Sequence, residues 1–279
     1  MAIKDILLVL KSYPEPTSDK AIEYAVSAAS TIGSHIAAIA CETHVEVPSS
    51  LISSSLINVP AIIAEEAHKS RINADKLLST FENAAARQGV LFESIRERAL
   101  SGVAPALFTE YARLRDLAIV PLADDDDQSC LEAIIFGSGR PTLVVPERWG
   151  SHPFQLRTAV IAWDFSRTAA RAVADAIPLL ETAKHVRVVT VAGEKSIETR
   201  RSAEELAKNL ARHGLDVVLD KVTSKGESIG DVLESYVRSC NADMLVMGAY
   251  GHTRFREFVL VGATRSLLAK PSLPILFSH

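Results

Sequence analysis

The chain has 279 residues, which is long for one hydrophobic core and comfortable for two domains of about 140 residues each. Hydrophobic residues make up 48% of it and charged residues 23%, and the formal net charge is −4. This balance is typical of a globular protein and excludes a strongly basic surface that would attract nucleic acid.

Cysteine use and hydropathy predict where the chain resides. Cys41, Cys130 and Cys240 lie far apart and form no CxxC pair, which argues against a zinc site and fits a reducing compartment. The apolar run from Ile6 to Leu10 is too short for the core of a signal peptide, and no stretch approaches the roughly 20 apolar residues of a membrane span. We expect a cytoplasmic protein with no membrane or nucleic-acid partner.

Short apolar runs alternate with helical patterns along the whole chain. In the first half we predict strands at 4–10, 35–41, 91–97, 117–122 and 142–146, and helices at 18–32, 61–88, 102–114 and 128–138. In the second half we predict strands at 158–163, 186–192, 216–222, 243–248 and 274–278, and helices at 166–183, 197–213, 227–240 and 262–270. Continuous Val-, Ile- and Leu-rich strands that alternate with helices indicate parallel sheets buried on both faces. The predicted fold is α/β, with two similar doubly wound domains that each hold a five-stranded, mainly parallel sheet.

The two halves repeat the same features in the same order, which indicates a duplication. We expect the first domain at 1–147 and the second at 155–279, joined by the segment at 146–157, which is rich in proline and polar residues. The alignment of the halves pairs Leu10 with Trp163, Ala40-Cys41-Glu42 with Ala192-Gly193-Glu194, Asp116 with Asp243, Pro121 with Gly248, and Pro141 with Pro274.

Ligands of doubly wound sheets bind outside the carboxyl ends of the strands. In the second half Asp164 directly follows the first strand, where it could accept hydrogen bonds from a base or ribose. Alternatively it merely belongs to the cap of the next helix, a role that Ser166 or Asp164 would suit. Val191 and Ala192 end the second strand, either as small residues that let a flat ring approach the backbone or as ordinary turn residues.

A glycine pattern follows the fourth strand of the second half, in the segment GAYGHTRFREFVLVGATRSLL. Gly248 and Gly251 could adopt positive φ and leave backbone N–H groups open to an anion, or could simply form a turn. A helix that starts near Gly262 would add its N-terminal N–H groups.

This segment resembles the signature of the universal stress protein family, and AWDFSRTAARAVADAI resembles the first strand and helix of that family. The resemblance covers the chain as two family domains, a tandem layout, and implies a fold similar to the adenine-nucleotide alpha-hydrolases. It implies a site for ATP with magnesium. In that site Asp164 would contact the adenine side, and the backbone near Val191 and Ala192 would frame the ring. Gly248 and Gly251 would lie along the ribose and phosphates, and Gly262, Ala263 and Thr264 would face the phosphates.

The chain departs from the family signature at several positions. In the signature, nine residues separate the second glycine, here Gly251, from a third. This chain has Val261 in place of that third glycine, and its branched side chain resists positive φ. The first half departs further, because Lys11 stands in place of Asp164, Pro121 in place of Gly248, and four aspartates occupy 124–127, where phosphate would be repelled. We predict that the first half has a degenerate nucleotide site.

No HExxH, GxSxG or GxxxxGK[ST] motif and no ligand set for a metal is visible, so we expect a binding protein without catalytic residues, in which slow ATP hydrolysis stays open. The leading hypothesis is a nucleotide-responsive tandem universal stress protein that acts on a protein partner. The alternative is an interaction protein or small-ligand-binding protein of the same fold that binds no nucleotide, with the segment 43–70 as a lid or contact surface. A nucleotide-dependent synthetase is a weaker third choice.

The last strands, 142–146 and 274–278, could pair within one chain, giving either a pseudo-twofold monomer or a homodimer of such chains.

Overall fold

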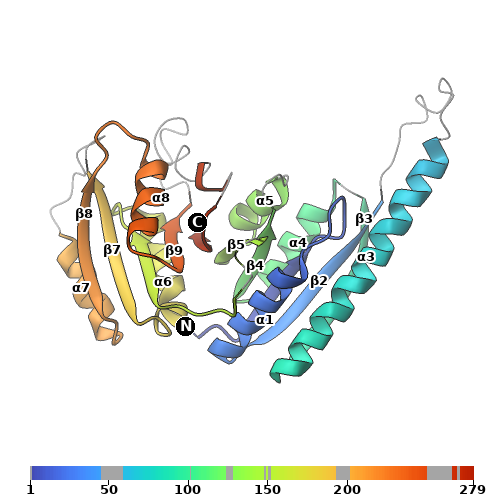
Figure 1. Ribbon diagram of the computed structural model, residues 1–279, viewed down its shortest axis with the longest axis horizontal. Coiled ribbons are helices and arrows are strands. Elements are labelled where there is room, and N and C mark those ends of the chain that lie inside the picture. The colour runs from blue at the N-terminus through green and yellow to red at the C-terminus, as the bar shows by residue number, and fades with distance from the viewer. Residues whose placement is uncertain are drawn as a thin grey trace.

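The computed structural model describes residues 2–44, 59–100, 102–123, 128–147, 149, 152–192, 202–249, 266–268 and 271–279. Its strands form a single ten-stranded sheet in the order β3-β2-β1-β4-β5-β10-β9-β6-β7-β8. Figure 1 shows that the sheet twists strongly along its length, so that the two halves of the chain form the two arms of a V. None of the helices in the described part of the chain is both long enough and apolar enough to cross a bilayer.

The elements of the first half follow the predicted order. Its strands are β1 (Asp5–Leu10), β2 (His35–His44), β3 (Phe92–Leu100), β4 (Leu117–Leu122) and β5 (Thr142–Pro146). Its helices are α1 (Asp19–Ile32), α3 (Val59–Gln88), α4 (Ala104–Arg113) and α5 (Ser129–Gly137). The main difference from the prediction is that β2 and β3 each run three residues further, which extends this side of the sheet beyond the end of β1.

The second half has the same order of elements. Its strands are β6 (Thr158–Ala162), β7 (His185–Ala192), β8 (Val217–Thr223), β9 (Met244–Gly248) and β10 (Ile275–Ser278). Its helices are α6 (Arg167–Leu180), α7 (Ala203–Arg212) and α8 (Ile229–Ser239). Most of the helix expected at 262–270 lies outside the described residues. The predicted fold class is confirmed, because strands and helices alternate and each half contributes five strands.

Helices cover both faces of the sheet, so its inner strands are buried on both sides, whereas the edge strands β3 and β8 stay partly exposed. One hydrophobic core joins the sheet to α1, α3, α6 and α7, and the other joins it to α4, α5 and α8. All residues of β4, β5, β9 and β10 are buried, as the continuous apolar runs predict.

The two halves meet edge to edge through their last strands. β10 pairs with β5 in antiparallel orientation, with Leu276 opposite Leu143, whereas the other strand pairs are parallel. The predicted pairing of these two strands within one chain is therefore confirmed, and it gives the chain a local twofold pattern.

Matching hydrogen bonds at the amino-terminal ends of the strands support the repeat. The carboxylate of Asp116 accepts the N–H groups of Lys4 at 2.8 Å and Asp5 at 3.1 Å. The carboxylate of Asp243 accepts those of Arg157 at 2.8 Å and Thr158 at 2.9 Å. Each aspartate thereby ties the start of the fourth strand of its half to the start of the first.

These bonds fix which residues of the two halves correspond. Because Asp5 matches Thr158, Leu10 matches Trp163 and Lys11 matches Asp164, as the sequence alignment predicts. The alignment of Ala40-Cys41-Glu42 with Ala192-Gly193-Glu194 is wrong by two residues: Asp5 pairs with His35 and Thr158 pairs with His185. Cys41 therefore matches Val191, and Glu42 matches Ala192. The error arose because the alignment followed residue identity at the strand ends, where the register of hydrogen bonds is not visible.

Candidate functional site at the strand ends of the second half

The carboxyl ends of β9, β6 and β7 lie side by side in the sheet. The chain leaves β6 on the face covered by α6, and it reaches β9 through α8 on the opposite face. The strand order therefore changes direction between β6 and β9, which is where doubly wound folds bind ligands. Of the predicted site residues, the structure brings together Asp164 after β6, Val191 and Ala192 in β7, and Gly248 at the end of β9.

Asp164 holds the turn that leads from β6 into α6. Its Oδ1 accepts the backbone N–H of Ser166 at 2.9 Å, and Ser166 caps the helix by accepting the N–H of Ala169 at 3.0 Å. Phe165, between them, has a φ of 63°, a left-handed conformation that is costly for an aromatic residue. Ser166, one of the two residues that the alternative offered as the cap, caps α6, whereas Asp164 fixes the turn before the cap. Its side chain remains partly exposed.

Gly248 is a glycine because α6 packs directly on it. A Cβ atom at this position would lie 2.5 Å from the backbone of Thr168 and Ala169. Gly248 does not adopt the positive φ that the sequence analysis considered. Its effect is to bring the N-terminus of α6 against the end of β9, beside Asp164.

The backbone of Val191 lies at the same strand ends as Asp164 and Gly248. The N–H of Trp163 donates to the carbonyl oxygen of Val189 at 2.9 Å, which is the last backbone bond between β6 and β7 that the structure gives. The N–H of Ser224 donates to the carbonyl of Ala192 on the β8 side. Because backbone groups alternate sides along a strand, the N–H and C=O of Val191 face the β6 side, beyond the end of that strand. Such a pair of groups matches the donor and acceptor edge of a heteroaromatic ring.

In the first half, side chains cover the corresponding strand ends. Ser12 matches Phe165, and its hydroxyl donates to the carbonyl of Cys41, which matches Val191, at 2.5 Å. Ser70 of α3 bonds to the Ser12 hydroxyl at 2.8 Å and accepts the N–H of Thr43 at 2.8 Å. Ser12, Cys41 and Ser70 are all at least 97% buried. Helix α3 thus occupies the position over the strand ends that stays partly exposed in the second half.

The loop after β1 adds to this closure. Asn73 of α3 donates from its side chain to the carbonyl of Ser12 at 2.9 Å. Thr17 binds Lys11 twice, through its hydroxyl and through its N–H, both at 2.9 Å. Ser12 and Ser70 were not among the predicted site residues. The available signal was a serine in the buried stripe of α3, at the spacing of Ala74, Leu77 and Phe81.

Several predicted features lie outside the described residues. They are the site residues Gly251, Gly262, Ala263 and Thr264, the substituted position Val261, the aspartates at 124–127, and residues 45–58 of the lid at 43–70. The rest of that segment belongs to the end of β2 and the start of α3. Within the described residues, no group of three or more His, Cys, Asp or Glu side chains could hold a metal ion.

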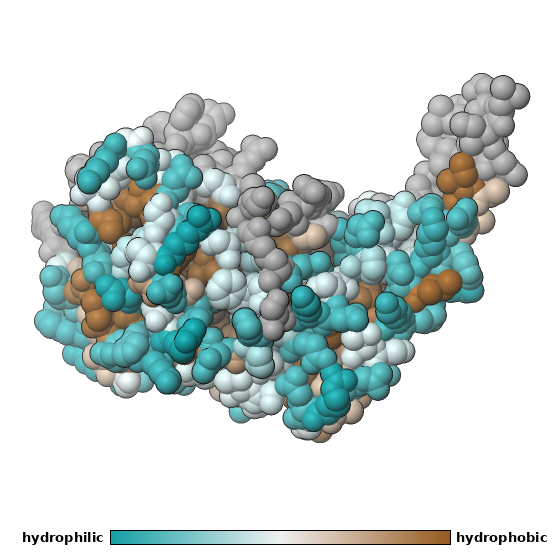
Figure 2. Space-filling view, in the orientation of Figure 1, coloured by the Kyte–Doolittle hydropathy of each residue, from teal (hydrophilic) through white to brown (hydrophobic). Residues whose placement is uncertain are grey.

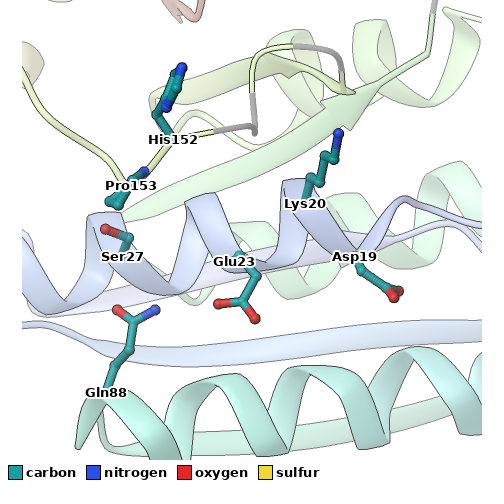
Figure 3. Close-up of a pocket in the computed structure, with 7 residues that line it drawn as sticks. All are labelled: Asp19, Lys20, Glu23, Ser27, Gln88, His152 and Pro153. Atoms are coloured by element: carbon teal, nitrogen blue, oxygen red, sulfur yellow. The ribbon is translucent and has the colours of Figure 1, made fainter.

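A groove of about 370 Å³ lies away from the strand ends, between α1 and the segment that joins the halves (Figure 3). Its lining residues are Asp19, Lys20, Glu23, Ser27, Gln88, His152 and Pro153. Ser27 accepts the N–H of Phe154 at 3.0 Å, and Phe154 packs edge to face on Tyr24. These contacts bind the connecting segment to α1, so we assign the groove to the joint between the halves and not to a ligand site.

An ion-pair network also lies apart from the strand-end residues. The Tyr236 hydroxyl of α8 donates to Asp220 at 2.6 Å and accepts from the Arg187 guanidinium at 2.9 Å, and Arg187 pairs with Asp220 at 2.8 Å. Burial, and then the bond to Asp220, raise the pKa of Tyr236 to about 12. The network therefore holds α8 on β7 and β8 with a neutral phenol at its centre.

Comparison with known proteins agrees with the resemblance of the second half. Residues 155–279 match the model of the Universal stress protein family. The matched range is the second half of the chain. The chain is also 28% identical to the universal stress protein Slr1230 of Synechocystis sp. over 152 residues, which are 52% of this chain and 49% of that protein. The chain thus matches about half the length of this curated relative.

Solved structures extend the likeness in fold to the whole chain. A universal stress protein from Archaeoglobus fulgidus superimposes with a TM-score of 0.68, covering 98% of this chain and 95% of that one at 14% identity. A structure from Pseudomonas aeruginosa gives a TM-score of 0.60, covering 99% of this chain and 93% of that one, also at 14% identity. At such identities these neighbours show the fold alone, and the shared fold extends over both sides of the β5–β10 joint.

Proposed function

We propose that the chain is a tandem universal stress protein that binds an adenine nucleotide, ATP with magnesium, at the strand ends of its second half. The observation that carries this proposal is a difference between the two halves at corresponding strand ends. In the second half, Asp164 and the backbone of Val191 flank a partly exposed strand end, with the start of α6 held beside them by Gly248. In the first half, Ser12 and Ser70 take up the corresponding groups.

The chemistry of these groups suits a nucleotide. The N–H and C=O of Val191 offer a donor and an acceptor to a base edge, and the carboxylate of Asp164 offers acceptors to a base amino group or a ribose hydroxyl. The N-terminus of α6 adds a partial positive charge on the same side. These groups bind and orient a ligand and supply no nucleophile, so we propose that the protein acts by binding. Bound ATP would change the contacts with a protein partner through its different affinity for two states of the protein.

The test is isothermal titration of nucleotide-free protein with ATP and magnesium, after mass spectrometry of any ligand that copurifies. We expect one site per chain. Asp164→Ala removes both the turn and the acceptor, and it should weaken binding at least tenfold. Asp164→Asn keeps an oxygen for Ser166 and should weaken binding less. Asp19→Asn, an exposed carboxylate at the start of α1, is the matched control in the first half and should bind as the wild type does. Folded protein that binds no nucleotide, or Asp164→Ala with unchanged affinity, would rule the proposal out.

A second candidate, an interaction protein that binds no nucleotide, is favoured by the distribution of exposed apolar side chains. Among the described residues the first half exposes eight large apolar side chains: Ile62, Ile72, Leu91, Phe92, Leu100, Val103, Leu114 and Phe136. The second half exposes one, Val218. Helix α3 projects beyond the sheet and carries apolar surface near its N-terminal end (Figures 1 and 2). Crosslinking that traps a partner on α3 in protein that shows no nucleotide binding would favour this candidate.

A further inference from the structure

Two arginines of the first half, Arg113 and Arg140, lie at the turns that lead into β4 and β5. Arg113 is in the last turn of α4, and its Nε donates to the carbonyl oxygen of Gly137, the last residue of α5, at 3.0 Å. Arg140 follows α5, and its Nε donates to the carbonyl oxygen of Arg113 at 3.3 Å. The carbonyl groups that end a helix point out past its last turn, so both guanidinium groups lie beyond the amino-terminal ends of these strands.

Neither guanidinium is neutralised by a carboxylate within the described part of the chain. Each bonds a backbone carbonyl through Nε, and its Nη atoms have no partner among the described residues. Arg115, two residues after Arg113, is an ordinary paired arginine by comparison, with Asp5 at 3.3 Å and Glu93 at 3.2 Å. The free Nη groups form the planar fork that binds phosphate oxygens. The pair is thus a local positive site in a chain whose net charge is −4.

The antiparallel joint brings these arginines to the second half. Thr142 pairs with Phe277, so the start of β5 lies beside the end of β10. Continued by two residues, the same register sets Arg140 opposite His279. A contact between the halves agrees with this placement, because Phe136 of α5 packs edge to face on the ring of His279, with 5.1 Å between ring centroids. Figure 1 shows α5 next to the end of the chain marked C.

His279 connects this point with the end of β9. Its Nδ1 donates to the carbonyl oxygen of Ala249 at 3.0 Å, and the N–H of Ala249 donates to the carbonyl of Ser278 at 2.8 Å. Ala249 directly follows Gly248, against which α6 packs. Because neighbouring strands lie about 4.8 Å apart, the start of β5 is roughly 10 Å from the end of β9. The two arginines therefore lie at the same edge of the sheet as the strand ends of the second half.

The sheet order gives the direction in which a bound nucleotide would extend. A base that bonds the backbone of Val191 and the carboxylate of Asp164 lies over the ends of β7 and β6. The next strands along the sheet are β9, β10 and β5. The ribose and phosphates then continue over the end of β9 towards the arginines.

The second half offers no such charge to the strand ends of the first half. Counted back from the two matched aspartates, Cys240 has the position of Arg113, and counted back from the two aligned prolines, Leu273 has the position of Arg140. The arginine in the last turn of α8, Arg238, forms an ion pair within its own helix. Unpaired arginines thus adjoin the half whose strand ends are partly exposed, and uncharged residues adjoin the half whose strand ends are covered.

We propose that Arg113 and Arg140 form an anion site in the first half that binds the terminal phosphates of a nucleotide held at the strand ends of the second half. This inference rests on the proposed function and deepens it, because it makes the site a shared one and assigns the residues that recognise the phosphate chain. A nucleoside triphosphate reaches both guanidinium groups, whereas a monophosphate ends before them. The pair therefore selects the ligand by its number of phosphates.

The experiment measures dissociation constants of ATP and AMP, with magnesium, by isothermal titration. We expect the wild type to bind ATP more tightly than AMP. Arg113→Gln and Arg140→Gln should each weaken ATP binding about tenfold, the usual effect of one lost bond to a charged group, and leave AMP binding unchanged. Arg113→Lys keeps the charge without the planar fork and should weaken ATP binding less. Arg212→Gln, at an exposed arginine in the last turn of α7, is the matched control and should bind both nucleotides as the wild type does.

Inorganic tripolyphosphate tests whether the arginines bind phosphate without the base. It should compete with ATP in the wild type, and it should compete less in the double variant Arg113→Gln/Arg140→Gln. Unchanged ATP affinity in both single variants, equal weakening of ATP and AMP, or equal competition in the double variant would overturn the arginine site. The proposed function would then still stand on the Asp164 variants. Wild-type protein that binds neither nucleotide would overturn both.

Discussion

At the end of β1 the first half has Leu10, Lys11 and Ser12, where the second half has Trp163, Asp164 and Phe165 at the end of β6. The backbone of the two strands is held in the same way, by Asp116 in one half and Asp243 in the other. The halves differ in whether a side chain binds the backbone carbonyl at the end of the neighbouring strand. The first half satisfies the carbonyl of Cys41 with the hydroxyl of Ser12, whereas Phe165 has no hydroxyl to offer Val191.

One fold can thus be closed or left open at the carboxyl ends of its strands with few changes. The five-stranded sheet, the helix order and the capping serine of the first helix are common to both halves: Ser18 caps α1 and Ser166 caps α6. The closure of the first half comes from one serine in the loop after β1 and from a 30-residue helix, α3, that carries a second serine. Three experiments test this contrast.

The largest effect is expected for Gly248→Ala. The added methyl group would lie 2.5 Å from the backbone of α6, so the start of that helix must move. We expect the free energy of unfolding to fall by about 2–3 kcal/mol, as for other overpacked sites, and nucleotide binding to weaken with it. Urea unfolding and ATP titration of the same variant measure both.

The control for this substitution is Gly102→Ala in the first half. Nothing lies within 4 Å of a Cβ atom at Gly102, and its φ is not in the left-handed region, so stability should change by less than about 0.5 kcal/mol. If Gly248→Ala were as stable as this control, the close packing of α6 on β9 would not be what requires a glycine there.

A smaller effect is expected for Ser70→Ala in α3. The change removes the bonds to Ser12 and to the N–H of Thr43, and it should lower the free energy of unfolding by about 1–3 kcal/mol. Ser79→Ala, at an exposed position of the same helix, should be nearly neutral in the same urea titration.

The same variant also tests what closes the first half. Lys11 and Pro121 remain in Ser70→Ala, so we expect the number of ATP sites to stay at one. A second site in the titration would show that α3 alone closes the first half, and that the substitutions at the strand ends contribute nothing.

The smallest effect concerns alkaline pH and Tyr236. Because burial raises its pKa from the ordinary value of 10.0 to about 12, the folded protein keeps the phenolic proton where the unfolded chain has lost it. The stability from this group is therefore fully present below pH 10 and is lost as the pH rises towards 12.

The check is to measure urea midpoints from pH 9 to 11.5 for the wild type and Tyr236→Phe, and the variant should lose less stability over this range. Tyr111→Phe is the counterpart in the first half, where the bond to Glu97 is the main cause that raises the pKa of Tyr111. Identical slopes in the wild type and Tyr236→Phe would contradict a shifted phenol in the second half.

Much of the fold could be predicted from the sequence. The apolar runs placed the inner strands to within a few residues, because strands buried on both faces leave continuous Val-, Ile- and Leu-rich segments. The repeat predicted the equivalence of Asp116 and Asp243, and the pairing of β5 with β10 within one chain was one of the arrangements considered. These features are set by hydrophobic pattern and repeat order, which a single sequence shows directly.

The site was predicted less completely, because its character depends on contacts between distant segments. The reason for Gly248 lies in α6, 79 residues or more away along the chain, and a local pattern of glycines suggests positive φ instead. The bond between Ser12 and Ser70 joins two ordinary serines 58 residues apart. The two-residue error at Cys41 and Val191 has the same origin, since register is a property of two strands together.

The pairing of β5 with β10 has a consequence for how such a molecule can change over generations. In an assembly of two identical chains, each substitution appears on both sides of the axis at once, so a residue that closes one pocket closes its twin. Here the two sides are encoded separately within one polypeptide. A serine acquired near one strand end leaves the other side unchanged, so each side can accumulate its own substitutions. The shared sheet meanwhile keeps the two sides together in a one-to-one ratio.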